Sequence, residues 1–241
     1  AEVSRIFRQK NEQYRSAVKD LADGDIKTAF EKLDAMGAIQ NIDPMQPNKK
    51  LVEDYIDTLK TGKSALVVSP TNAQGDQVTH DIRHALRKAG KLGKKEVVAP
   101  RLKNLNLTEA QKTDWRSFKE NQVVQFNQNV NGAKRGSAWT VAQTDETGIK
   151  LVNPEGKSLY LPTHKSDAYD VLEKGEIELS KGDQIRITRN LYDLNDKRLD
   201  NGQMLDVISV KKKGKIILRN PISRVTYELD KDVGHLTHAY C

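Results

Sequence analysis

The first third of the chain carries apolar residues at the spacing of amphipathic helices. The stripe is interrupted by a polar break at residues 23–25 and then resumes, and its members are Tyr14, Val18, Leu21, Ile26, Phe30 and Leu33. This pattern predicts a helical hairpin over residues 1–40, with Gly37 closing the second helix. A further stripe at residues 51–59 predicts a helix that ends near Gly62.

A continuous apolar run at residues 65–68 is typical of a strand buried on both faces. Residues 78–89 then carry a helical stripe that stops at Gly90. A strand, a polar loop and a helix in this order predict part of a parallel α/β sheet. Ligands bind such sheets at the carboxyl ends of the strands, which is where residues 69–72 would lie.

From residue 123 onward the apolar period changes to two, which is typical of β-strands. Two sets of short strands are expected, one within residues 123–161 and the other within residues 185–229. Residues 119–124 align with 180–185, and residues 148–151 with 214–218. The alignment predicts two small β-barrel-like modules in tandem, with chance similarity between two β-rich stretches as the alternative. The expected fold class is a multi-subdomain α+β or α/β protein with N-terminal helices, a partial α/β lobe and inserted β modules.

Composition limits the class of protein. No apolar run approaches the length that spans a membrane and no secretory signal is visible, so we expect no membrane insertion. Cys241, the single cysteine, excludes a disulfide framework and a cysteine-based zinc site, and it favours a reducing cytoplasm. The chain begins at Ala1 without methionine, and we expect it to be a piece of a longer protein.

The charge balance favours an anionic partner. The net charge is +7, from 40 Lys and Arg against 33 Asp and Glu, and residues 181–220 contain ten basic and five acidic side chains. A local excess of this kind points first to nucleic acid.

No group of side chains has the spacing of a catalytic or metal site. Residues 61–64 resemble the end of a phosphate-binding loop, but Asp57 stands where that motif needs glycine, and the segment ends a helix. We therefore expect a helix C-cap there and no ATP site. A third metal ligand is missing from each histidine pair, so helix-surface and loop histidines are expected at His80, His84, His235 and His238. We expect this chain to have no catalytic residue, metal or cofactor.

Residues 182–190 form the most distinctive stretch. Alternation places Ile185 and Ile187 on one face of a strand, and Gln184, Arg186 and Thr188 on the other. An exposed arginine beside a hydroxyl suits a phosphate or an acidic partner. An ordinary solvated strand face is the alternative, and residues 211–214 are expected to form a solvated hairpin turn.

Five segments, taken in their order along the chain, point to one family. They are residues 6–9, 66–72, 108–111, 181–190 with Asn201-Gly202, and 234–240. Together they resemble RecD-like superfamily 1B helicases, and most closely the helicase portion of the F-type conjugative relaxases, which nick and unwind plasmid DNA. The resemblance implies the helical end of a first RecA-like lobe at 1–48 and a partial second lobe at 49–107. It further implies a first β module at 108–178, an SH3-like second module, subdomain 2B, at 179–222, and a return to the second lobe at 223–241.

The resemblance implies a translocation signal that a type IV secretion coupling protein, or another component of that system, recognises. The family's signal pattern is Gly, acid, Arg, Leu or Met, Arg, apolar, Thr. It corresponds here to Gly182, Asp183, Gln184, Ile185, Arg186, Ile187 and Thr188. Gln184 departs from the pattern, which has arginine there, and Ile185 departs mildly.

The resemblance also implies a clamp for single-stranded DNA within a helicase. The residues expected to bind DNA are Pro70, Thr71, Asn72, Lys134, Arg135, Arg186, Arg189 and Asn190. Aromatic side chains for base stacking are sparse, and Trp139 is expected in a core. The alternatives are a clamp in a 5′–3′ helicase without any recognition role, and a basic domain that only scaffolds its neighbours.

The longer parent protein is expected to be an ATP-dependent helicase and relaxase, with ATP and Mg²⁺ held mainly by lobes outside this chain. Arg8 and Gln9 would lie near that nucleotide. The parent is expected in the bacterial cytoplasm and to be exported to a recipient cell by type IV secretion.

Overall fold

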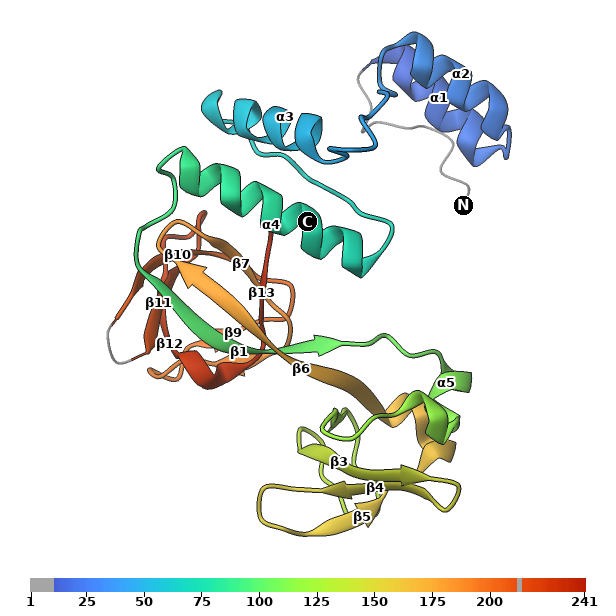
Figure 1. Cartoon of the computed structure of the whole chain (residues 1–241), viewed down its shortest axis with the longest axis vertical. Coiled ribbons are helices and arrows are strands. Elements are labelled where there is room, and N and C mark those ends of the chain that lie inside the picture. The colour runs from blue at the N-terminus through green and yellow to red at the C-terminus, as the bar shows by residue number, and fades with distance from the viewer. Residues whose placement is uncertain (1–10, 212–213) are drawn as a thin grey trace. The chain divides into compact units, whose positions relative to one another are not determined.

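The computed structural model describes residues 11–211 and 214–241 of the chain (Figure 1). The chain divides into two compact units, one up to Asp57 and the other from Thr58 onward. Helices and antiparallel sheets together place the protein in the α+β class. Arg8 and Gln9, which we expected near a nucleotide, lie outside the described residues.

The first unit contains the predicted helical hairpin, formed by α1 (Glu12–Ala22) and α2 (Ile26–Ala35). Asn11 caps α1 by accepting a hydrogen bond from the Tyr14 amide. Ala17 and Ala29 have no exposed surface, because such small side chains let the two backbones approach closely. Helix α3 (Lys49–Lys60) follows.

Gly62, with a φ of +75°, lies just beyond the end of α3. Residues 61–64 therefore end a helix, as predicted, and do not form a phosphate-binding loop. The next segment corrects the sequence analysis. Residues 63–69 adopt no regular secondary structure, and Leu66 and Val68 are 90% and 81% exposed.

The prediction of a buried strand at residues 65–68 is thus wrong for the described chain. An apolar run becomes a buried strand only when other strands pair with it, and the described residues supply no such strands. The strands of each sheet pair antiparallel with their neighbours, so the expected parallel sheet is not present in the described part of the chain.

Helix α4 (Asn72–Lys88) forms where the apolar stripe predicted it. Thr71 caps its N-terminus by accepting a hydrogen bond from the Gln74 amide at 3.2 Å. Its buried face includes Val78, Ile82 and Leu86, and also the side chain of Arg83.

Two long antiparallel strands, β1 (Glu96–Asn104) and β6 (Tyr169–Ser180), run through the second unit (Figure 1). The sequence analysis missed both. Pro100 and several charged residues interrupt the apolar alternation of β1, and acidic residues interrupt that of β6. Proline is tolerated in β1 because this strand lies at the edge of its sheet.

The six-stranded sheet has the order β1-β6-β2-β3-β4-β5. Its shorter strands are β2 (Val123–Phe126), β3 (Ala138–Asp145), β4 (Gly148–Val152) and β5 (Ser158–Tyr160). Short helical turns accompany this sheet: α5 (Glu109–Thr113), η1 (Trp115–Ser117) and η2 (Thr163–Ala168). Thr108 and Gln111 form the predicted capping box at α5.

The five-stranded sheet has the order β12-β11-β10-β7-β13. Its strands are β7 (Gln184–Ile187), β10 (Met204–Val210), β11 (Lys215–Arg219), β12 (Thr226–Asp230) and β13 (Leu236–His238). Beside it lie the β8 (Leu191–Tyr192) and β9 (Arg198–Leu199) pair and the turn η3 (Lys231–Val233). The boundary expected at residue 222 therefore falls inside this sheet.

The two larger sheets share an internal pattern, in agreement with the predicted repeat. The neighbour order β2-β3-β4-β5 in one corresponds to β7-β10-β11-β12 in the other. The second strand of each set has a shift in register, after Val141 in β3 and after Val207 in β10. Both sheets are open at their edges, so the barrel-like modules expected from the sequence are not closed barrels.

Each sheet has its own hydrophobic core, and the long strand β6 contributes to both. Tyr169 and Val171 of β6 belong to the core of the first sheet, whereas Ile177 and Leu179 of the same strand belong to the second. Trp139 is buried in the first core, as expected. A groove lies where these elements meet.

Candidate nucleic-acid interface

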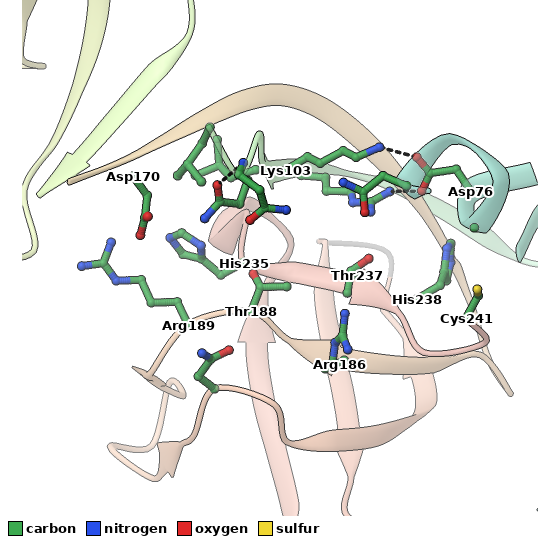
Figure 2. A pocket seen from close by; sticks show the side chains of 18 of the residues that line it. Asp76, Lys103, Asp170, Arg186, Thr188, Arg189, His235, Thr237, His238 and Cys241 are labelled. Atoms are coloured by element: carbon green, nitrogen blue, oxygen red, sulfur yellow. Dashed lines mark hydrogen bonds and ion pairs between the residues drawn. The ribbon is translucent and has the colours of Figure 1, made fainter. Parts of the chain in front are cut away.

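The groove in the second unit has a volume of about 1150 Å³. Parts of the chain that are far apart in sequence line it: residues 66–69, the start of α4, the end of β1, residues 135–136, the start of β6, β7 with the residues after it, and β13 (Figure 2). Strands β7 and β13 form its floor. They pair antiparallel, with Leu236 opposite Ile187 and Thr237 opposite Arg186.

The groove is positively charged. Its described lining includes five permanent cations, Arg101, Lys103, Arg135, Arg186 and Arg189, against the two carboxylates Asp76 and Asp170. Asp76 binds two of the cations, with ion pairs to Arg101 at 3.4 Å and to Lys103 at 2.5 Å (Figure 2). Such a field attracts phosphate groups.

Six of the eight residues predicted to bind DNA line this one groove, namely Thr71, Asn72, Arg135, Arg186, Arg189 and Asn190. They come from three separate stretches of the chain. The two others, Pro70 and Lys134, are exposed neighbours of lining residues and are not part of the lining.

The residues of the expected translocation signal have two different structural positions. Strand β7 alternates as predicted: Ile185 and Ile187 have no exposed surface, whereas Arg186 is exposed and Gln184 half-buried. Thr188 lines the groove together with Arg186. Gln184 and Arg186 are therefore the side chains a protein partner could contact, because the Thr188 hydroxyl is buried.

Gly182 and Asp183 have architectural roles. Gly182 has a φ of +95°, and a Cβ atom there would lie 2.4 Å from the carbonyl oxygen of Lys91. Asp183 is fully buried and accepts hydrogen bonds from the Arg83 guanidinium at 2.9 and 3.0 Å, from the Ser180 amide and from the Tyr240 hydroxyl. Its carboxylate therefore holds α4, β7 and the C-terminal segment together.

His235 lies in a loop, as expected, whereas His238 belongs to strand β13, which corrects the sequence analysis. Both line the groove (Figure 2). The Nε2 atom of His238 lies 2.9 Å from the Glu178 carbonyl oxygen, and burial lowers the pKa of His238 to about 4, so the ring is neutral at pH 7. His80 and His84, in contrast, are exposed on α4 as expected.

The groove offers hydrogen bonds but no stacking platform. None of the described residues that line the groove is Trp, Tyr or Phe. Seven of them carry amide side chains: Asn72, Asn104, Asn106, Gln125, Asn127, Asn190 and Asn201. Of the aromatic side chains elsewhere in the second unit, Trp139 and Phe126 are buried in a core, and Tyr160 and Tyr192 are exposed outside the groove. Phosphate binding and polar contacts to sugars and bases are the chemistry available.

Sequence reasoning missed the contribution of β1 to the groove. Arg101 and Lys103 are two positions apart on this strand, and Asn104 and Asn106 at and beyond its end also line the groove. Recognising residues 96–104 as a strand would have placed Arg101 and Lys103 on one face. The neighbourhood of His235 depends on tertiary structure and carries no sequence signal.

Across the residues that the structure describes, no cluster of His, Cys, Asp and Glu could hold a metal ion. Nor does any helix within them combine the length and apolar character needed to cross a bilayer. No protein-family model matches the chain, and comparison with curated proteins gives no match.

Proposed function

We propose that this chain is the single-stranded DNA-binding portion of a conjugative relaxase-helicase, and that the groove holds the DNA backbone. The observation that carries the proposal is the convergence of Thr71, Asn72, Arg135, Arg186, Arg189 and Asn190 on one cationic groove. Polar donors that approach a strand from several sides suit a flexible polyanion. The sequence resembles RecD-like helicases, with SH3-like and RecA-like parts. This resemblance is the reason for proposing single-stranded DNA as the ligand.

The test is a fluorescence-anisotropy titration of the full chain with labelled oligothymidylate at increasing salt. The three cations not bound by Asp76, which are Arg135, Arg186 and Arg189, would contact about three phosphates. A slope of about −0.7 per phosphate for single strands predicts roughly a 20-fold loss of affinity between about 50 and 200 mM salt. Binding that is absent or insensitive to salt contradicts the proposal.

A matched pair of variants separates the groove from general charge. Arg186→Ala is expected to weaken binding several-fold, because Arg186 is exposed and lines the groove. Arg198→Ala removes the same charge from an exposed side chain of β9, which pairs with Asp200 outside the groove, and is expected to leave binding unchanged. Equal effects of both variants would mean that only net charge matters.

A second candidate function is a translocation signal read by a type IV secretion coupling protein. The outward position of Gln184 and Arg186 on β7 favours it, because a partner could contact both side chains. Arg186 serves both hypotheses and cannot separate them.

Two other residues separate the functions. Gln184 belongs to the expected signal but not to the groove lining, whereas Arg135 lines the groove outside the signal. In a plasmid-transfer assay of the parent relaxase, loss of transfer by Gln184→Ala with unchanged DNA affinity supports the signal. Normal transfer by both Gln184→Ala and Arg186→Glu refutes it.

A further inference from the structure

Two polar atoms at one end of the groove are buried without a hydrogen-bond partner among the described residues. They are the Thr188 hydroxyl oxygen and the Nη1 atom of Arg189, on adjacent residues that follow β7. Buried polar groups are nearly always satisfied, so a pair of unsatisfied atoms beside a groove indicates a missing partner. A hydroxyl and a guanidinium can both donate to the same anion.

His235 completes this corner of the groove. Its backbone carbonyl accepts a hydrogen bond from the Thr188 amide at 3.1 Å, which brings the two residues together. Figure 2 shows the His235 ring, Thr188 and Arg189 at the same end of the groove, with Asp170 beside them. The corner thus collects three potential donors from the segments after β7 and before β13.

We infer that Thr188, Arg189 and His235 form a seat for one phosphate group. The inference rests on the proposed function, and it names the place where a phosphodiester of the bound strand is held most closely. The Thr188 hydroxyl and Arg189 Nη1 donate to phosphate oxygens, and the His235 ring adds a donor when it is protonated.

Asp170 does not already occupy this seat. No ion pair within 4.0 Å joins its carboxylate to Arg189 among the described residues. One carboxylate oxygen instead accepts a hydrogen bond from the Asn127 amide at 2.8 Å, and the other lies 4.0 Å from the Lys112 ammonium. Its negative charge is thereby partly compensated, and Arg135 adds a further positive charge to this part of the groove.

The protonation of His235 provides a readout specific to this seat. In the free protein, burial and then the charge of Arg189 lower the pKa of His235. The negative charge of a phosphate between the two offsets that of Arg189 and stabilises the protonated ring, which raises that pKa. The bound state then takes up a proton, so affinity increases as the pH falls through the range of histidine titration. The other charged groups that line the groove with this ring are Asp76, Arg101, Lys103, Arg135, Asp170 and Arg186.

The experiment measures the His235 pKa by NMR, with and without oligothymidylate, and the affinity of two variants. We expect the pKa to rise by about one unit, equivalent to an approximately tenfold gain in affinity at low pH. Thr188→Val is expected to bind about tenfold more weakly, because a hydrogen bond to a charged group is lost. Its melting temperature should not fall, since the deleted hydroxyl has no partner in the free protein.

His84→Gln, an exposed histidine outside the groove, is the control and should retain the pH dependence that His235→Gln loses. If the wild-type chain binds oligothymidylate while Thr188→Val binds equally well and the His235 pKa stays constant, the seat is refuted and the proposed function survives. If the wild type does not bind the oligonucleotide, the proposed function fails. Titration with inorganic phosphate then decides on the seat: a raised His235 pKa supports it, and an unchanged pKa refutes it.

Discussion

Replacing Asp183 by alanine should strongly destabilise the second unit, although this residue lies in the expected translocation signal. The carboxylate is fully buried and accepts four hydrogen bonds, two of them from the Arg83 guanidinium. Burial opposes the charge of Arg83, but the surrounding carboxylates raise its pKa, so the guanidinium stays charged. The substitution would leave this charge largely buried and undercompensated.

The size of the effect follows from what remains around Arg83. Removing one partner of a buried ion pair costs about 3–5 kcal/mol. Glu96 and Glu178 still contact the guanidinium at 2.9 and 3.3 Å, yet their side chains are 27% and 56% exposed and compensate less well. We therefore expect a loss of about 3 kcal/mol, towards the lower end of this range.

Urea unfolding followed by tryptophan fluorescence measures this loss. Trp115 and Trp139 both belong to the second unit, so the signal reports on that unit. With a denaturant slope of about 1–3 kcal/mol/M, the midpoint should fall by about 1–3 M. Asp200→Ala removes a carboxylate from the exposed pair with Arg198 and should cost less than about 1 kcal/mol.

A loss below about 1 kcal/mol for Asp183→Ala would refute this reasoning, because it would mean that the buried charges readjust freely. If the expected loss is found, failed plasmid transfer by an Asp183 variant reports lost stability and does not test signalling. Recognition is then testable only through outward residues such as Gln184 and Arg186.

Further predictions concern other parts of the second unit. Gly182→Ala should destabilise the protein by more than Gly156→Ala in the same urea assay. Both glycines have positive φ, but only at Gly182 would the added Cβ meet a backbone oxygen, and equal losses would refute the clash. The pKa of His238 is about 4 in the folded state, against 6.5 for an unperturbed histidine. Between these two values the unfolded chain binds a proton at His238 that the folded chain does not bind. Stability should therefore decrease by about 1.5 kcal/mol between pH 6.5 and pH 5. His238→Gln should reduce this slope in urea titrations at the two pH values, and an unchanged slope would refute the assignment.

Local chemistry allowed much of the fold to be predicted from the sequence. The helices α1 to α4 follow apolar stripes and polar caps, as with Thr71 at the start of α4. The alternation in β7 correctly placed Ile185 and Ile187 inside and Arg186 outside. These features depend on neighbours a few residues apart, so periodicity and capping chemistry suffice to predict them.

Features that depend on distant partners could not be predicted in the same way. The run at residues 65–68 has the composition of a buried strand but is exposed, because strand formation requires partners that the described residues do not supply. Strands β1 and β6 have weak local patterns, and they are stabilised by pairing with each other along nine residue pairs.

The candidate site shows the same division between local and tertiary information. From the sequence we could choose Asn72, Arg135, Arg186 and Arg189 as polar or basic residues suited to DNA, but their spacing along the chain does not place them together. Only the packing of α4, β1, β6, β7 and β13 brings them to one groove and adds Thr188 and His235 at its end. Residue type determined which groups could bind a phosphate; burial and long-range strand pairing decided which of them face the same cavity.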